Sequence, residues 1–150
     1  MFYTIWLHFN ITWKKLSVSV EYLLFPLKYR DYGPSLPYED STVESFYVQA
    51  SYRFDPRWEV MMRYDYGVAD RDDRDGTKFS ESTGGFFPAH YGFSKILTAG
   101  LRWDISSHWM VRLEYSYNQG TYILSERENP LMQNTQTYWN MVAAQLSFRF

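Results

Sequence analysis

Charged residues recur at every second position in several stretches of this 150-residue chain. Because side chains alternate across a β-strand, residues two apart share one face. The charged residues expected on this face are Glu21, Arg53, Glu59, Arg63, Asp65, Arg102, Arg112, Glu114 and Arg149. Rows of arginine attract anions, and acidic neighbours weaken that attraction. Since unpaired buried charges are costly, we expect the face to be wet, internally paired or both.

Each arginine on this face has two open roles, contact with a solute or stabilisation of the wall that carries it. A three-residue turn at 55–57 places Arg53 opposite Glu59 and Gln49 opposite Arg63. Opposite charges facing each other on neighbouring strands stabilise a sheet. We therefore expect at least one arginine to be neutralised, and the role of each of the others stays open.

Other residue types capable of chemistry do not form a recognisable centre. The run from Asp70 to Gly76 offers four carboxylates and a glycine, but its spacing does not match a calcium-binding EF-hand. His8, His90 and His108 stand on different predicted elements, and no G-x-S-x-G motif is present. We expect no enzyme activity, no metal site and no cofactor. The acidic run is interpreted as a solvated loop with internal Asp/Arg pairing, and weak divalent-cation binding is the alternative.

The composition narrows the class of protein. With 17 acidic and 15 basic residues the net charge is −2, which is too balanced for a nucleic-acid-binding surface. Cysteine is absent, so no disulfide framework is possible, and aromatic residues make up 21% of the chain, a proportion that suits strands. No window has the roughly 18 consecutive apolar residues of a membrane-spanning helix. The fold therefore has to be predicted from the alternation of polar and apolar residues along strands.

Seven stretches alternate as strands do, at about 3–11, 16–22, 46–54, 58–66, 97–103, 109–118 and 141–150. Their connections are short at 12–14, 55–57 and 104–108 and long at 31–43, 67–93 and 119–136. Short turns on one side and long loops on the other are typical of bacterial outer-membrane barrels. We predict an all-β, antiparallel up-and-down transmembrane β-barrel. Residues 1–150 are expected to form a single β-barrel domain or a C-terminal barrel fragment, and the even strand numbers of such barrels favour the fragment.

The apolar faces of the predicted strands carry aromatic residues at both ends. Trp58, Trp103 and Trp109 flank the short turns, while Tyr64 and Tyr115 lie towards the long loops. Amphipathic rings favour the headgroup level of a membrane, so we expect these faces to contact lipid. A soluble sandwich that buries the same faces against a second sheet is the alternative.

The closing strand ends in Phe148 and Phe150, a pattern that resembles the C-terminal signal read by the barrel assembly machinery of Gram-negative bacteria. The segments 47–54, 57–59, 63–65, 101–104 and 112–115 resemble the late hairpins of porin-like proteins. Over about residues 44–150 the chain is similar to the phosphate- and pyrophosphate-selective porins. The resemblance implies a larger barrel, usually a homotrimer, with an arginine-lined constriction, of which this chain is the C-terminal part.

These observations predict a porin-type channel in the cell outer membrane for passive diffusion of small hydrophilic solutes, anions among them. Because Glu114 and Asp65 oppose the arginines, we expect only a modest anion preference. The expected partners are outer-membrane lipid and lipopolysaccharide, the assembly machinery and small solutes. Two alternatives remain open: a closed structural or adhesive outer-membrane barrel, and a soluble β-barrel that binds an apolar ligand.

Overall fold

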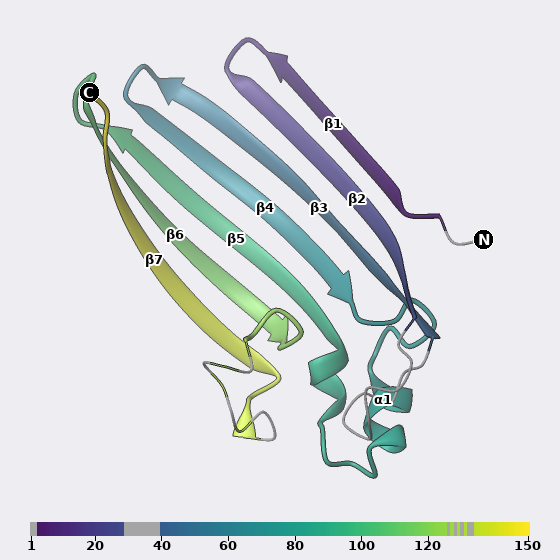
Figure 1. The fold of residues 1–150 in the computed structure, drawn as a ribbon. Helices are drawn as coiled ribbons and strands as arrows, with labels where there is room; N and C mark the ends of the chain where they lie inside the picture. Colours follow the sequence, from purple (N-terminus) through teal and green to yellow (C-terminus); the bar gives the residue numbers. More distant parts are fainter. Residues whose placement is uncertain (1–2, 29–39, 126, 128, 130, 132–133) are drawn as a thin grey trace.

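A computed structural model describes residues 3–28, 40–125, 127, 129, 131 and 134–150. These residues form seven strands and two short helical segments (Figure 1). They are β1 (Ile5–Trp13), β2 (Leu16–Lys28), β3 (Asp40–Asp55), β4 (Trp58–Val68), α1 (Thr77–Ser82), η1 (Ala89–Gly92), β5 (Phe93–Asp104), β6 (Trp109–Gly120) and β7 (Tyr138–Phe148). The predicted number of strands is confirmed.

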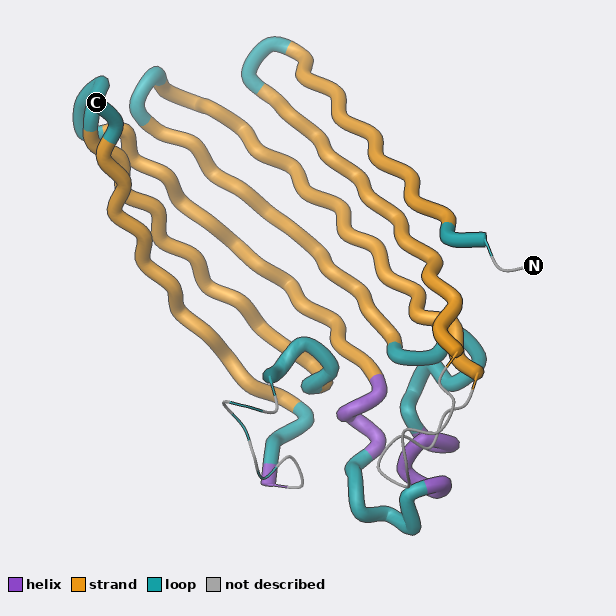
Figure 2. Tube along the Cα trace, in the orientation of Figure 1, coloured by secondary structure: helices purple, strands orange, loops and turns teal. Residues whose placement is uncertain are grey.

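All seven strands lie in one antiparallel sheet, in the order β1-β2-β3-β4-β5-β6-β7. Each strand pairs with its neighbour in sequence, which confirms the predicted up-and-down connectivity. The sheet curves into a trough and is not closed, since β1 and β7 form its two edges (Figure 2). The curvature gives every strand a concave and a convex side, with successive residues on opposite sides.

The three short connections lie together at one rim of the trough, and the connection from β4 to β5 lies at the other, with α1 in it (Figure 1). The first short turn consists of Lys14 and Lys15 rather than residues 12–14, because Thr12 and Trp13 still pair with β2. The second follows a register shift between Tyr52 and Asp55. A residue at such a shift bends the strand and increases its twist.

The long connections are shorter than predicted because the strands continue into them. Of the predicted loop 31–43, residues 31–39 lie outside the described part of the chain, and 40–43 belong to β3, where Asp40 pairs with Lys28. The loop 67–93 loses two residues to β4 and one to β5, and it contains α1 and η1. Gln119 and Gly120 belong to β6. Pairing with the neighbouring strand therefore extends the ladder past the point where the sequence alternation weakens.

Apolar burial is concentrated at the long-loop rim. Among the described residues the buried apolar side chains are Val68, Phe79, Phe93 and Ile96. Phe79 of α1 also stacks on Phe87 and Tyr91 at ring-centroid distances of 5.8 and 5.5 Å, so this loop has a small core of its own. No described helix has the length and apolar character needed to cross a membrane.

Candidate functional site

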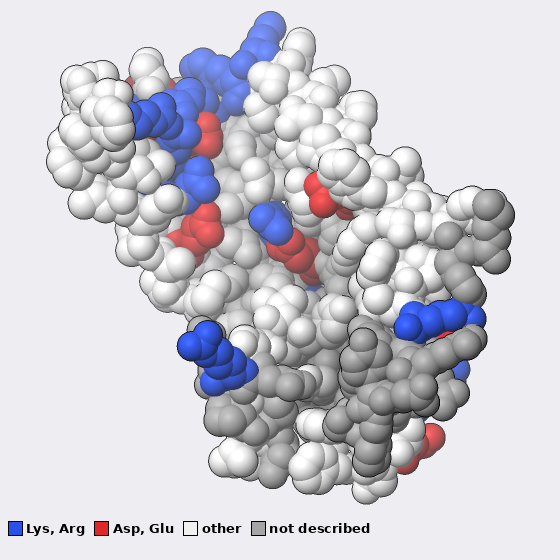
Figure 3. Space-filling model, in the orientation of Figure 1, with Lys and Arg blue, Asp and Glu red and all other residues white. Residues whose placement is uncertain are grey.

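The concave side of the sheet is formed by alternate residues of all seven strands and carries the charged and most of the hydroxyl side chains, with apolar residues such as Met61 and Met141 among them. One row across it runs through Asn10, Ser19, Gln49, Arg63, Thr98, Ser116 and Met141. This surface encloses a hollow of about 680 Å³, in which basic and acidic side chains are visible (Figure 3). We call it the concave face, and the opposite side the convex face.

Seven of the nine charged residues predicted from the alternation line this hollow. They are Glu21, Glu59, Arg63, Asp65, Arg102, Arg112 and Glu114. Arg53 lies beside them at the short-turn rim, where it binds Glu59. Arg149 lies beyond the last residue of β7, in a second hollow that also contains Arg102 and His108. The strand predicted to reach Phe150 ends at Phe148, although the Arg149 amide still donates to the His108 carbonyl at 2.8 Å.

Three arginines of the concave face pair with an acidic residue two positions further along their own strand. Arg63 Nε donates to Asp65 Oδ1 at 2.7 Å, Arg102 Nη2 lies 2.9 Å from Asp104 Oδ1, and Arg112 Nη1 lies 3.6 Å from Glu114 Oε1. Residues two apart on a strand share a face, so these long side chains reach along the wall. The acidic partners therefore offset part of the positive charge of these arginines.

Arg53 joins three strands at the short-turn rim. Its guanidinium lies 3.1 Å from Glu59 of β4 and 2.8 Å from Asp104 of β5, and it donates to the Pro56 carbonyl at 3.0 Å. The predicted contact between Arg53 and Glu59 is confirmed, as is the pairing of Gln49 with Arg63. Asp104 was not among the predicted residues, because it was assigned to the turn rather than to the end of β5.

Arg102 and Arg112 stand directly opposite each other on β5 and β6. Like charges in this position destabilise a sheet. Each has an acidic partner on its own strand, Asp104 and Glu114, which offsets the repulsion. The pairing along each strand thus allows two arginines to be neighbours on one wall.

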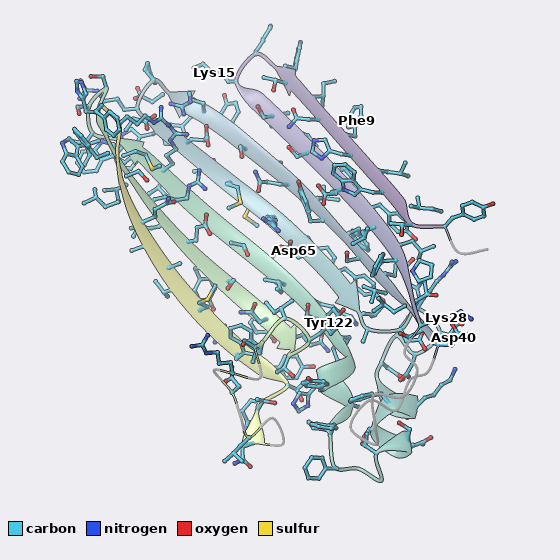
Figure 4. The ribbon with its side chains drawn as sticks, viewed as in Figure 1. Phe9, Lys15, Lys28, Asp40, Asp65 and Tyr122 are labelled. Atoms are coloured by element: carbon cyan, nitrogen blue, oxygen red, sulfur yellow. The ribbon has the colours of Figure 1, made fainter. Side chains whose placement is uncertain are left out.

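Tyr122 and Ile123 also line the hollow and were not predicted, because they follow β6 in what was interpreted as an outward loop. Figure 4 shows Tyr122 over the trough, near its long-loop end. The turn starts at Gly120, whose φ of +86° favours glycine, and a Cβ there would lie 2.1 Å from the Phe93 carbonyl oxygen. The only sequence signal for this inward turn is that glycine.

Several polar contacts of the concave face come from residues without an obvious role in the sequence. The Arg63 guanidinium lies 4.6 Å from the centre of the Tyr47 ring, and His8 Nδ1 lies 3.4 Å from Glu21 Oε2. His8 pairs with Glu21 in the register of β1 and β2. Aligning the first two predicted strands around a tighter turn could have identified this contact.

The acidic run after β4 does not form the internal Asp/Arg pairs that we predicted. The Asp73 carboxylate accepts from the amides of Lys78 and Phe79, at 3.1 and 2.8 Å, and Asp75 accepts from the amide of Thr77 at 3.1 Å. Arg74 instead lies 2.5 Å from Glu44 of β3. Local side-chain hydrogen bonds to the backbone compete with ion pairing in such turns.

His90 holds two of the long connections together. Its ring nitrogens lie 3.0 and 3.2 Å from the hydroxyls of Thr135 and Thr137, and its carbonyl accepts from the Thr121 amide at 2.8 Å. Burial lowers the pKa of His90, and a hydrogen bond with Thr135 partly opposes that shift. The neutral imidazole is therefore the form that suits this loop contact.

A family model described as phosphate-selective porin O and P matches residues 4–150 of the chain. This range includes all seven strands and every residue of the concave face named above. No curated protein and no solved structure gives a match.

Proposed function

The chain belongs to the phosphate-selective porin O and P family of outer-membrane channels, and from that premise we propose that its concave face lines a water-filled passage for small hydrophilic solutes. Membership in an outer-membrane family sets aside the soluble barrel that binds an apolar ligand. We propose that the convex face contacts lipid, because an outer-membrane strand has one apolar side and one polar side.

The observation that carries the proposal is the contrast between the two sides of the same strands. The hollow of the concave face is lined by charged and hydroxyl side chains from β2 to β6, with some apolar residues such as Leu23 and Met61 between them. Adjacent residues on the convex face are apolar and exposed, as Val48, Met62 and Leu113 are. A charged wall is stable when water or a partner solvates it, and a passage for hydrophilic solutes supplies that water.

We propose further that the passage has a modest preference for anions. Arg63 and Arg112 raise the local concentration of anions, while Asp65 and Glu114 beside them reduce the effect. In addition we propose that more strands complete the barrel, because both edge strands of the trough carry ladder groups that need partners in a membrane.

Reversal potentials of the intact protein in a salt gradient test this function. We expect a small anion preference that decreases in Arg63→Ala and Arg112→Ala and nearly disappears at high salt, because salt screens charges over about 3 Å at 1 M. Lys28→Ala is the matched control, since it removes one positive charge from the convex side of β2. Its selectivity should equal that of the wild type.

Two outcomes would contradict the proposal. A cation-selective wild type, or one unaffected by either arginine substitution, would remove these arginines from the solute path and leave them as structural partners of their acids. A correctly inserted protein that passes no steady current would instead favour the closed structural or adhesive barrel.

A further inference from the structure

The convex face carries a row of rings next to the long-loop rim. In register across β2 to β7 the row consists of Tyr22, Phe46, Tyr66, Lys95, Gln119 and Tyr138. Tyrosine is enriched where a membrane meets water, so this row marks the level of the outer headgroups. Lys95 is the cation within the row, and its ammonium lies 5.4 Å from the centre of the Phe93 ring.

The acidic connection after β4 folds back over this same convex side. The Arg71 amide donates to the Thr42 carbonyl at 2.7 Å, and Arg74 binds Glu44, which also accepts from the Tyr22 hydroxyl at 2.8 Å. The Glu44 side chain lies on the convex side of β3 with the ring row, because Glu44 is two residues from Phe46. The connection is therefore attached just beyond the ring row.

The attachment brings cations from two separate segments to one open hollow. Arg71, Arg74 and Lys78 of the connection line it together with Tyr66 and Lys95 of the ring row. Arg74 is occupied by Glu44. Lys78 Nζ donates to a backbone carbonyl, that of Asp72, at 2.8 Å. Within the described part of the chain, no carboxylate lies at ion-pair distance from Arg71, Lys78 or Lys95.

Three acidic residues also line the hollow, and two of them accept hydrogen bonds from backbone amides of the connection. Asp73 is buried and binds the amides of Lys78 and Phe79, and Asp75 binds the amide of Thr77. Asp72 and Asp75 are both exposed, so their carboxylates also face solvent. These carboxylates lower the positive charge of the hollow, but none forms a described ion pair with Arg71, Lys78 or Lys95, so these three cations remain able to bind a ligand from outside the chain.

We propose that Arg71, Lys78 and Lys95 form a binding site for the phosphate groups of a lipid headgroup in the outer leaflet. The site lies on the lipid-facing side, at the level of the ring row, and presents cations that lack anionic partners. A phosphate monoester carries up to two negative charges and accepts charge-assisted hydrogen bonds from arginine and lysine. The inference rests on the outer-membrane location and is independent of conduction through the barrel.

Titration of lipid A, a phosphorylated glycolipid, into the intact protein in detergent tests the site, with native mass spectrometry measuring the bound fraction. Each basic residue near a membrane surface strengthens binding of anionic lipid by about fivefold. We therefore expect Lys95→Gln alone to weaken binding by about fivefold, and R71Q/K78Q/K95Q to weaken it on the order of a hundredfold. R71K/K95R, which keeps both charges, should bind like the wild type.

The matched control is K14Q/K15Q/R57Q, which removes three exposed cations from the short-turn rim. It should bind lipid A as the wild type does, and all variants should keep the single-channel current of the wild type, which shows that they are folded. Equal binding by R71Q/K78Q/K95Q and the wild type would overturn the proposal. So would displacement of lipid A by an equal concentration of inorganic phosphate, because the site would then select a free anion rather than a lipid.

Discussion

The concave and convex faces are built from the same seven strands, yet they distribute polar and apolar side chains in opposite ways. On the convex face Met62 is 51% exposed and Leu146 is 63% exposed. On the concave face Ser116 is 3% exposed and Asn118 is 1% exposed, and the Asn118 amide donates to the Ser116 hydroxyl at 3.1 Å. Polar side chains are packed against one another on the concave face, whereas Met62 and Leu146 on the convex face are apolar and exposed.

This distribution is the reverse of that in a water-soluble protein, where apolar side chains are buried in a core. It indicates that the two faces of the sheet contact different solvents. An exposed apolar surface of this extent marks contact with a membrane or a partner. Packed polar groups need hydrogen-bond partners, and the concave face supplies them within its own rows. Because the backbone is the same on both sides, the position of a residue in the alternation should decide what a substitution costs.

The largest expected effect compares two adjacent methionines of β4. Met62 lies on the convex face and Met61 lines the hollow. Met62→Arg should destabilise the folded protein by roughly 2 to 4 kcal/mol, because it places a charge near the bilayer midplane. Met61→Arg should cost less than about 1 kcal/mol, because its charge enters water. Equilibrium unfolding in lipid vesicles measures both values.

The two variants control for each other, because they change the same residue type in the same strand to the same residue. Met62→Leu and Met61→Leu should both be nearly neutral, since they keep the side chain apolar and similar in volume. Equal costs for the two arginine variants would mean that both faces meet the same solvent, and the contrast between them would be lost.

A smaller effect is expected within the concave face, where the acidic residues differ in how many arginines they hold. Asp104 binds both Arg53 and Arg102, whereas Glu114 has a single contact with Arg112 at 3.6 Å. Asp104→Asn should cost roughly 1 to 2 kcal/mol of unfolding free energy, and Glu114→Gln should cost less than about 0.5 kcal/mol.

Both substitutions should also raise the anion preference, because each removes a negative charge from the wall. Unfolding titrations and reversal potentials on the same preparations separate the two effects. If Glu114→Gln proved the more destabilising of the two, the network around Arg53 would not be what holds the short-turn rim together.

The smallest effect concerns His90, which lies outside both faces. Burial lowers its pKa, so the unfolded loop binds a proton more readily than the folded one. The contact should be most stable at neutral pH and should weaken as pH falls through about 6.5, the ordinary histidine value. Hydrogen exchange of the Thr121 amide, which His90 holds, should report a loss below about 1 kcal/mol.

His90→Gln keeps a polar side chain that can reach the same hydroxyls but does not titrate. Its Thr121 exchange should therefore be the same at pH 7 and pH 5, apart from the intrinsic rate change. A pH dependence that survives this substitution would assign the effect to another group.

The strands were predictable because polar and apolar residues alternate along them, and this alternation assigns each residue to one face of the sheet. Met61 and Met62 are assigned to opposite faces by position alone, and the predicted contact between Arg53 and Glu59 is present, although the turn is Pro56 and Arg57 rather than 55–57. The inward turn at Tyr122 and the attachment of Arg74 to Glu44 were not predictable. Both depend on loop backbone geometry, which has no period, and on contacts between segments far apart in the sequence.

The central claim, that the concave face meets water and the convex face meets lipid, is tested most directly by single cysteines along β4. The chain contains no cysteine of its own. At Met61, Arg63 and Asp65 a cysteine should react with a charged, membrane-impermeant thiol reagent in the intact inserted protein. At Val60, Met62 and Tyr64 it should be protected from that reagent and reached by a lipid-dissolved one. The opposite pattern would contradict the account, because a one-residue change of register exchanges the two faces.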